Sequence, residues 1–141
     1  MLCSKILVAY DESELAFKSL EKAIELAKLD PAIEIHVLHA VTLPIKPNIY
    51  GNAFQQIEES MRTHGNEVVQ KAEALLSELP NASQTYVIEG SAITALLEHA
   101  KTNHCDLIIM GSRGLSGFKE FLGSVSHSIV QQSPVPVLLV K

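Results

Sequence analysis

Residues 106–126 read Asp-Leu-Ile-Ile-Met-Gly-Ser-Arg-Gly-Leu-Ser-Gly-Phe-Lys-Glu-Phe-Leu-Gly-Ser-Val-Ser. The apolar run from 107 to 110 predicts a short strand that is buried on both faces. Gly111 and Gly114 follow, and they permit backbone angles and close approaches that a residue with a Cβ resists. Gly123 and Ser124 then begin a predicted helix. A strand, a glycine-rich loop and a helix N-terminus in this order predict a phosphate site, because free N–H groups and the positive end of the helix dipole face the anion.

The rest of the chain alternates strands with helices. Apolar runs predict strands over residues 5–10, 33–40, 85–88, 107–110 and 135–140. Apolar residues recur at helical spacing between these runs, and Ser13 and Ser91 are the predicted N-caps of the first and third helices. This pattern predicts a single α/β domain over residues 1–141, in which a doubly wound five-stranded parallel sheet has helices on both faces.

Sheets of this kind bind ligands beyond the carboxyl ends of their strands, where the strand order reverses. Asp11 follows the first predicted strand and Gly111 ends the fourth, so both are expected to flank that crevice. The sheet topology and the glycine loop therefore predict a ligand at the same place.

The spacing of the glycines excludes two common phosphate loops, since the chain contains neither G-x-x-x-x-G-K-[ST] nor G-x-G-x-x-G. It contains Gly111-x-x-Gly114, then the eight residues 115–122, then Gly123-Ser124. This arrangement resembles the nucleotide-binding signature of the universal stress protein family, in which the gap is one residue longer. The resemblance covers essentially the whole chain, including Val8-Ala-Tyr-Asp-Glu-Ser-Glu14, Leu38-His39-Ala40 and the terminal Pro-Val-Leu-Leu-Val.

The resemblance implies strand order 3-2-1-4-5 and a site for ATP or a related adenine nucleotide, with Mg²⁺ held through the phosphates and no metal held by protein side chains alone. It implies adenine near Ala9, Ala40 and Met110, ribose near Asp11, and phosphates near Gly111, Gly114, Gly123, Ser124 and Val125. Tyr10 and Arg113 complete the predicted nucleotide-binding set.

Each polar candidate also has a structural interpretation. Asp11 binds a ribose hydroxyl or a metal-bound phosphate, or it accepts backbone N–H groups at the helix entry. Ser124 bonds phosphate or serves as an N-cap. Arg113 and Lys119 pair with phosphate, or they face solvent as exposed loop cations usually do.

Composition excludes other classes of partner. The chain has 11 Lys and Arg against 16 Asp and Glu, a net charge of −5, and its basic residues are scattered, so a nucleic-acid surface is not expected. Cys3 and Cys105 have neither metal-ligand nor C-x-x-C spacing, which predicts small buried thiols. With no signal sequence before the first strand and no run long enough to span a membrane, a cytoplasmic protein is expected.

The histidines do not predict a catalytic or metal site. His36 and His39 lie three apart on a predicted strand and therefore point to opposite faces. His99, His104 and His127 fall on different elements, and none has an acidic residue at a sequence spacing typical of a metal or catalytic site. The chain also lacks a Gly-x-Ser-x-Gly elbow and a signal for paired carboxylates, so no catalytic residue is predicted.

Three functions remain at this point. The first is a nucleotide-binding regulatory module of stress survival, dimeric through residues 135–140. The second is a structural or interaction protein whose shorter loop binds no nucleotide. The third is a slow ATPase, for which no residue is clearly placed to activate water. The dimer is expected because an apolar final strand at a sheet edge offers free N–H and C=O groups to a second chain.

Overall fold

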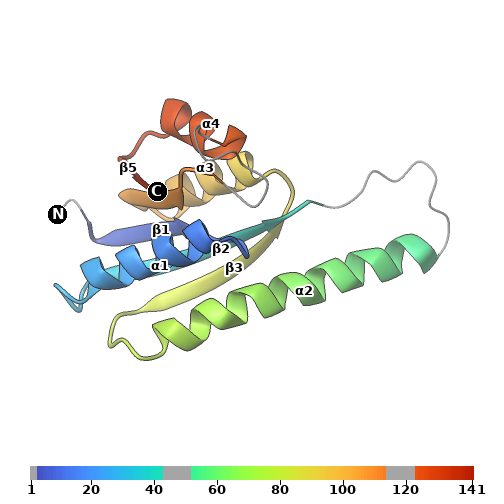
Figure 1. The fold of residues 1–141 in the computed structure, drawn as a ribbon, viewed down its shortest axis with the longest axis horizontal. Coiled ribbons are helices and arrows are strands. Elements are labelled where there is room, and N and C mark those ends of the chain that lie inside the picture. Colours follow the sequence, from blue (N-terminus) through green and yellow to red (C-terminus); the bar gives the residue numbers. More distant parts are fainter. Residues whose placement is uncertain (1–2, 43–51, 114–122) are drawn as a thin grey trace.

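The computed structural model describes residues 3–42, 52–113 and 123–141 (Figure 1). It contains one five-stranded sheet in the order β3-β2-β1-β4-β5, and every neighbouring pair is parallel. The strands are β1 (Lys5–Ala9), β2 (Glu34–Val41), β3 (Ser83–Glu89), β4 (Leu107–Gly111) and β5 (Val137–Val140). Both the fold class and the strand order are therefore confirmed.

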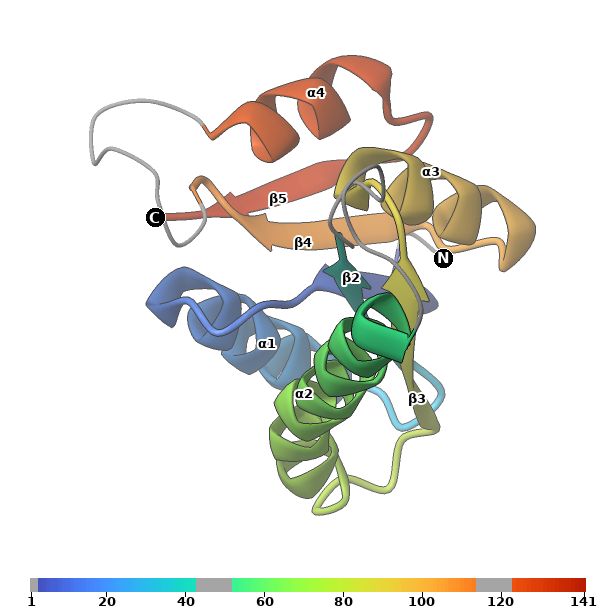
Figure 2. The ribbon, with the colours of Figure 1, turned by 90° about the vertical axis from the view of Figure 1, so that its right-hand side faces the viewer.

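The helices cover both faces of the sheet. They are α1 (Glu14–Ala27), α2 (Asn52–Leu76), α3 (Ala92–Thr102) and α4 (Ser124–Gln132). Helices α1 and α2 lie on one face, and α3 and α4 lie on the other (Figure 2). The predicted N-caps are confirmed, because Ser13 Oγ accepts from Ala16 N at 3.1 Å and Ser91 Oγ accepts from Thr94 N at 3.5 Å. None of the described helices is long and apolar enough to cross a membrane.

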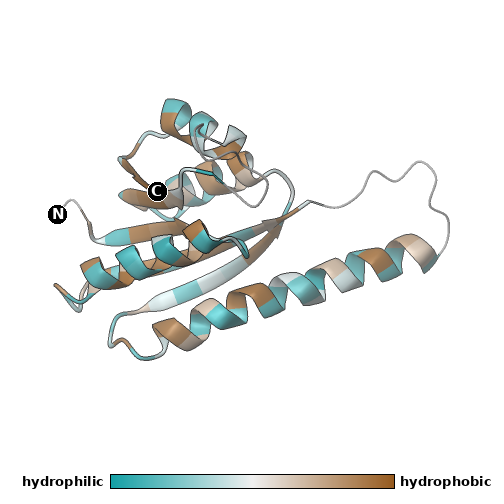
Figure 3. Ribbon diagram, viewed as in Figure 1, coloured by the Kyte–Doolittle hydropathy of each residue, from teal (hydrophilic) through white to brown (hydrophobic). Residues whose placement is uncertain are grey.

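Alternation along the strands divides the core into two clusters. Ile6, Val8 and Val37 point toward α1 and α2 and belong to the first cluster. Leu7 and Leu38 point toward α3 and α4 and belong to the second, which we call the α3/α4 cluster. The outer strand β3 is visibly less hydrophobic than the central strands, in keeping with its partly exposed side chains (Figure 3).

The helix α2 covers the sheet with only its carboxyl-terminal half. Its buried residues all lie from Gly65 onward, and its amino-terminal half extends beyond the strands (Figure 1). Gly65 has a packing role here, since a Cβ at this position would lie 2.9 Å from Val87 Cγ1 and 3.1 Å from Val41 Cγ2. The absence of a side chain lets the helix approach β2 and β3.

A single buried amide fixes the connection from α1 to β2. Asn81 Nδ2 donates to the carbonyl oxygens of Ala27, Asp30 and Ile33 at 3.0, 3.0 and 2.8 Å. Asn81 lies between α2 and β3, so it joins two connections that are distant in the sequence.

The last strand is shorter than predicted. Residues 135–140 were expected to form it, whereas β5 spans Val137–Val140. Pro134 and Pro136 carry no N–H, and Val135 N donates to Ser133 Oγ at 3.1 Å instead of to the sheet. The ladder therefore begins only after Pro136.

Candidate functional site

The three residues expected near adenine lie on one side of the sheet. Ala9 ends β1, Ala40 lies near the end of β2, and Met110 lies near the end of β4. Met110 is buried in the α3/α4 cluster, against which Ala9, Ala40 and Val125 pack as partly buried residues. Two alanines in these positions occupy little volume at the edge of an otherwise bulky apolar layer.

Tyr10 does not join this group. Its side chain is 9% exposed and belongs to the cluster on the opposite face of the sheet. Burial and the nearby carboxylate of Asp11 raise its pKa. Its main-chain groups are also engaged, because Tyr10 N donates to Leu38 O at 2.9 Å and Tyr10 O lies 2.9 Å from His39 Nδ1. Adjacent strand residues point to opposite faces, so Ala9 and Tyr10 cannot offer side chains to the same ligand.

Asp11 performs the structural role that was one of its two interpretations. Its Oδ1 accepts the N–H of Ser13 at 2.7 Å and so shapes the turn from β1 into α1. No described residue bonds its Oδ2. One carboxylate oxygen therefore remains for a ligand at the switch point between β1 and β4.

Gly111 is required by close packing. A Cβ at Gly111 would lie 2.7 Å from Leu15 Cβ on α1 and 3.1 Å from Arg113 O. Among the described residues, the only glycine with a positive φ is Gly90, at 127°. The close packing at Gly111 is therefore against α1, and the phosphate contact predicted for this residue stays a prediction. Arg113 makes no ion pair within the described residues, and Gly114 and Lys119 lie outside them.

The N-terminus of α4 differs from the prediction at one residue. Gly123 is the N-cap, with φ −66° and ψ 160° and no side-chain cap hydrogen bond, so the assignment of Ser124 as the cap is wrong. Ser124 is the first residue of the helix and is exposed. A glycine cap contributes no side-chain acceptor, which leaves the first-turn N–H groups without the usual protein partner.

Two serines that the sequence did not single out hold α4 against β4. Gly123 N donates to Ser112 O at 2.8 Å. The buried Ser126 Oγ contacts Ser112 O at 2.8 Å and Gly123 O at 3.0 Å. These bonds fix the helix N-terminus beside the carboxyl end of β4, although the connecting residues 114–122 are not described.

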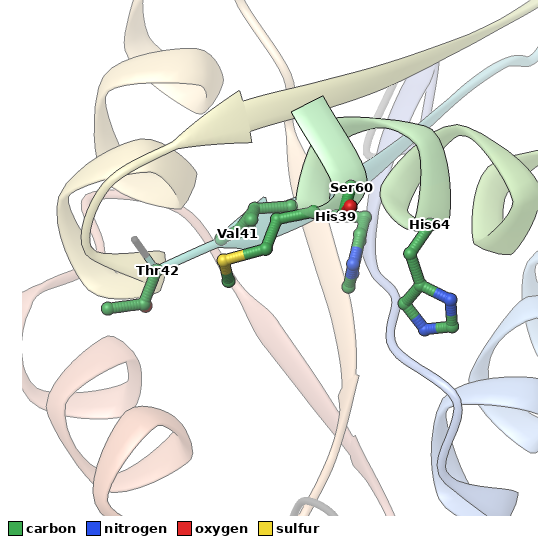
Figure 4. A pocket seen from close by; sticks show the side chains of 7 residues that line it. His39, Val41, Thr42, Ser60 and His64 are labelled. Carbon is green, nitrogen blue, oxygen red and sulfur yellow. The ribbon is translucent and has the colours of Figure 1, made fainter. Parts of the chain in front are cut away.

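A pocket of about 360 Å³ lies between the carboxyl end of β2 and α2 (Figure 4). It is lined by His39, Ala40, Val41, Thr42, Ser60, Met61 and His64. His64 Nε2 lies 3.1 Å from Glu12 Oε1, which ties α2 to the turn that follows β1. The pocket adjoins the predicted site through Ala40, and the contribution of α2 was not predicted.

Three metal-ligating side chains meet elsewhere in the α3/α4 cluster. His36 Nδ1 lies 2.8 Å from His99 Nε2, and Cys105 is their neighbour. Burial, followed by His36 and Lys5, lowers the pKa of His99 to about 4. Burial raises the pKa of Cys105 to about 11. His36 and His39 do point to opposite faces, but no local pattern predicts that His36 meets His99.

The sequence model described as the universal stress protein family matches residues 3–141. This chain belongs to the universal stress protein family. A curated universal stress protein of Bacillus subtilis, YxiE, is 34% identical, and the alignment covers 98% of this chain and 99% of the relative. The predicted family is therefore confirmed.

Solved universal stress proteins share the fold. UspA of Lactobacillus plantarum has a TM-score of 0.82 at 19% identity, covering 98% of this chain and 97% of that one. An Arabidopsis thaliana family member solved with AMP bound has a TM-score of 0.74 at 19% identity, covering 98% and 91%. An Archaeoglobus fulgidus universal stress protein in complex with dAMP has a TM-score of 0.73 at 19% identity and covers both chains completely. At these identities the likeness shows the fold alone.

Proposed function

We propose that this universal stress protein is a cytoplasmic regulatory module that binds ATP or a related adenine nucleotide at the carboxyl ends of β1, β2 and β4. The observation that carries the proposal is the gathering of Ala9, Ala40 and Met110 on the side of the sheet where α4 begins. Small side chains beside a buried methionine suit a flat apolar base. The AMP and dAMP found in solved members of the family support the choice of adenine nucleotides.

The polar groups around this apolar edge suit the rest of a nucleotide. The Oδ2 of Asp11, which no described residue bonds, is an acceptor for a ribose hydroxyl. The N–H groups of the first turn of α4 suit phosphate oxygens, since the N-cap Gly123 brings no side chain that would occupy them. Arg113 adds a cation to the same region, and Mg²⁺ would be bound through the phosphates.

The first experiment asks whether the chain binds a nucleotide at all. Mass spectrometry of denatured, freshly purified protein should detect a co-purified adenine nucleotide, and calorimetry should show ATP or AMP binding in preference to GTP. If neither method finds a nucleotide, the chain is an interaction protein. Phosphate release from ATP above background would instead support an ATPase.

The role of Asp11 can be tested with a matched pair of variants. Asp11→Asn still offers an oxygen acceptor to Ser13 N–H, but it removes the carboxylate charge proposed to face the ribose. Asp30 is the control, because its Oδ1 accepts Ala32 N at 2.9 Å in the same kind of turn. Asp11→Asn should weaken nucleotide binding about tenfold, as expected for a lost hydrogen bond to a charged group. Asp30→Asn should leave the affinity unchanged, and equal losses in both variants would contradict the assignment.

We further propose that the protein is a homodimer through residues 135–140. β5 is an edge strand, and its Leu138 side chain is 41% exposed. An apolar edge with free hydrogen-bonding groups favours pairing with a second copy. Sedimentation should give a dimer at micromolar concentration, and Leu138→Lys should give monomers or aggregates. A wild-type monomer under these conditions would exclude the dimer.

A further inference from the structure

Three buried side chains with nitrogen or sulfur atoms lie together at the end of the α3/α4 cluster opposite to the proposed nucleotide site. His36 comes from β2, His99 from the last turn of α3, and Cys105 from the connection between α3 and β4. Their side chains are only 3%, 6% and 3% exposed. One ligand atom from each lies within 4.8 Å of the other two, the one such group of three or more among the described residues. Three segments thus direct nitrogen and sulfur atoms to one buried point.

We propose that His36, His99 and Cys105 form a binding site for a transition-metal ion, with Zn²⁺ the ion best matched to its donors. Two imidazoles and one thiolate are ligands that Zn²⁺ prefers. Three protein ligands would leave the fourth tetrahedral position to water. The sequence predicted no metal held by side chains, because His36 and His39 point to opposite faces and His99 lies on another element; the proposed site instead joins His36 with His99 and Cys105.

The three ligand atoms lie within 4.8 Å of one another, so they would have to move to reach the spacing of a loaded site. Zn–N bonds of about 2.0 Å and Zn–S bonds of about 2.3 Å place ligand atoms roughly 3.3–3.6 Å apart in a tetrahedron. The two histidine nitrogens lie 2.8 Å apart, so they must separate by about 0.5 Å to admit the ion. The thiol loses its proton to solvent when the sulfur binds, because the thiolate is the ligand.

A carboxylate behind His36 provides a second, independent observation. His36 Nε2, the ring nitrogen opposite the ligand atom, lies 3.4 Å from Glu34 Oε1. It is buried and has no hydrogen-bond partner among the described residues. When Nδ1 binds a metal, the imidazole proton must be on Nε2, where it faces this carboxylate. A carboxylate in that position orients a ligating histidine and increases its basicity.

Lys5 balances the charge of this carboxylate. Its Nζ lies 3.5 Å from Glu34 Oε2 and donates to Asn103 O at 2.9 Å. A hydrogen-bonded histidine pair with a structural role would explain the 2.8 Å contact alone. It would not explain why a thiol and a carboxylate lie on two further sides of the pair.

An aromatic side chain at the edge of the sheet lies against both histidines. The ring of the partly buried Tyr86, on the outer strand β3, lies 5.3 Å from the His36 ring and 4.4 Å from the His99 ring between centroids. Tyr86 is only partly buried, so an ion that enters on this side would displace its ring. Once bound, it would link β2, α3 and the α3–β4 connection and would stabilise the folded state.

The first test uses the untagged full chain with Cys3→Ser, stripped by a chelator and free of nucleotide. The chain has two cysteines, so Cys105 is then its only thiol. Co²⁺ should give the thiolate charge-transfer absorption and intense visible bands of a tetrahedral site, at one ion per chain. Zn²⁺ should displace Co²⁺ and raise Tm by roughly 5–10 °C at a hundredfold excess over Kd.

Variants then identify the ligands. Cys105→Ser and His99→Gln should each weaken Zn²⁺ binding by more than the about tenfold loss expected from Glu34→Gln, which acts only through His36. His127→Gln is the control, because His127 is exposed on α4, and it should bind Zn²⁺ normally.

Two results would overturn the proposal. They are the absence of a thiolate band in the Cys3→Ser chain and an equal loss of Zn²⁺ binding in His127→Gln. The first result does not depend on whether Cys105→Ser folds.

Discussion

The two ends of the α3/α4 cluster differ in the size and polarity of their side chains, although both belong to the same apolar layer. At the carboxyl end, Ala9 and Ala40 leave space, and Gly123 leaves backbone N–H groups without a side-chain partner. At the amino end, His36 and His99 fill the space with imidazole rings, of which Nδ1 of His36 and Nε2 of His99 pair with each other. The carboxyl end is proposed to bind its ligand through free space and backbone N–H groups, and the amino end is proposed to bind its ligand through side chains. The two proposed sites therefore differ in whether backbone groups or side chains would hold the ligand.

Acid should destabilise the amino end most, by roughly 3 kcal/mol in the metal-free protein. The pKa of His99 is about 4 in the folded chain, against 6.5 for the unperturbed group. The unfolded chain binds the proton first, so stability is lost as the pH falls from about 6.5 to about 4. The groups that face His99 or lie beside it are His36, Tyr86, Cys105, Lys5 and Glu34.

Urea denaturation at pH 7 and pH 4.5 measures this loss. The reference is the double variant His36→Leu/His99→Leu, which lacks the pair but keeps all other titrating groups. An equal pH dependence in both proteins would show that the histidines do not distinguish this end of the cluster.

Breaking the pair should cost about 2 kcal/mol, because His99→Leu leaves a buried imidazole nitrogen of His36 unsatisfied. Replacing both histidines with leucine should recover most of that loss, since two apolar groups leave no unmet hydrogen bond. The measurement is the free energy of unfolding without metal. Exposed His127→Leu should change it by less than about 0.5 kcal/mol. A double variant that is as unstable as the single one would show that the pair contributes more than mutual satisfaction.

Filling the carboxyl end should abolish binding while the fold survives. Ala40→Leu places a larger side chain in the space proposed for adenine, and we expect at least about a tenfold loss of AMP or ATP affinity, equivalent to about 1.4 kcal/mol. Calorimetry measures the affinity, and circular dichroism measures the fold. Ala74→Leu on the exposed face of α2 is the control. Unchanged affinity in Ala40→Leu would move the proposed base away from this end.

The smallest effect is expected from Ser124→Ala. Ser124 is exposed and is not the helix cap, so the free energy of unfolding should change by less than about 0.5 kcal/mol. Nucleotide affinity should fall a few-fold if its hydroxyl bonds phosphate, in line with about 1 kcal/mol for one hydrogen bond. Ser128→Ala, one turn further along α4, provides the comparison in calorimetry.

The contrast between the two ends also explains what could be predicted from the sequence. Local signals predicted the strands and the caps Ser13 and Ser91, whereas only the resemblance to the family pointed to the trio Ala9, Ala40 and Met110. The alternation of side chains along β1 would also have excluded Tyr10 from the predicted nucleotide-binding residues, since its side chain must point away from that of Ala9. His36 and His99 are 63 residues apart, and no local pattern connects them. Their meeting depends on the rotation of α3 over β2, which is decided by packing rather than by spacing.

The buried Asn81 makes the refolding of this chain sensitive to deamidation. Deamidation converts the amide into a carboxylate, which has no N–H to offer. The new group would face the three carbonyl oxygens of Ala27, Asp30 and Ile33 that the amide now serves. Buried acceptors without a donor oppose folding, so a chain damaged here returns to the native state less readily than an intact one. In the folded chain these three bonds hold the amide in place. Damage at Asn81 should therefore accumulate mainly in molecules that have already unfolded, and it would make their unfolding harder to reverse.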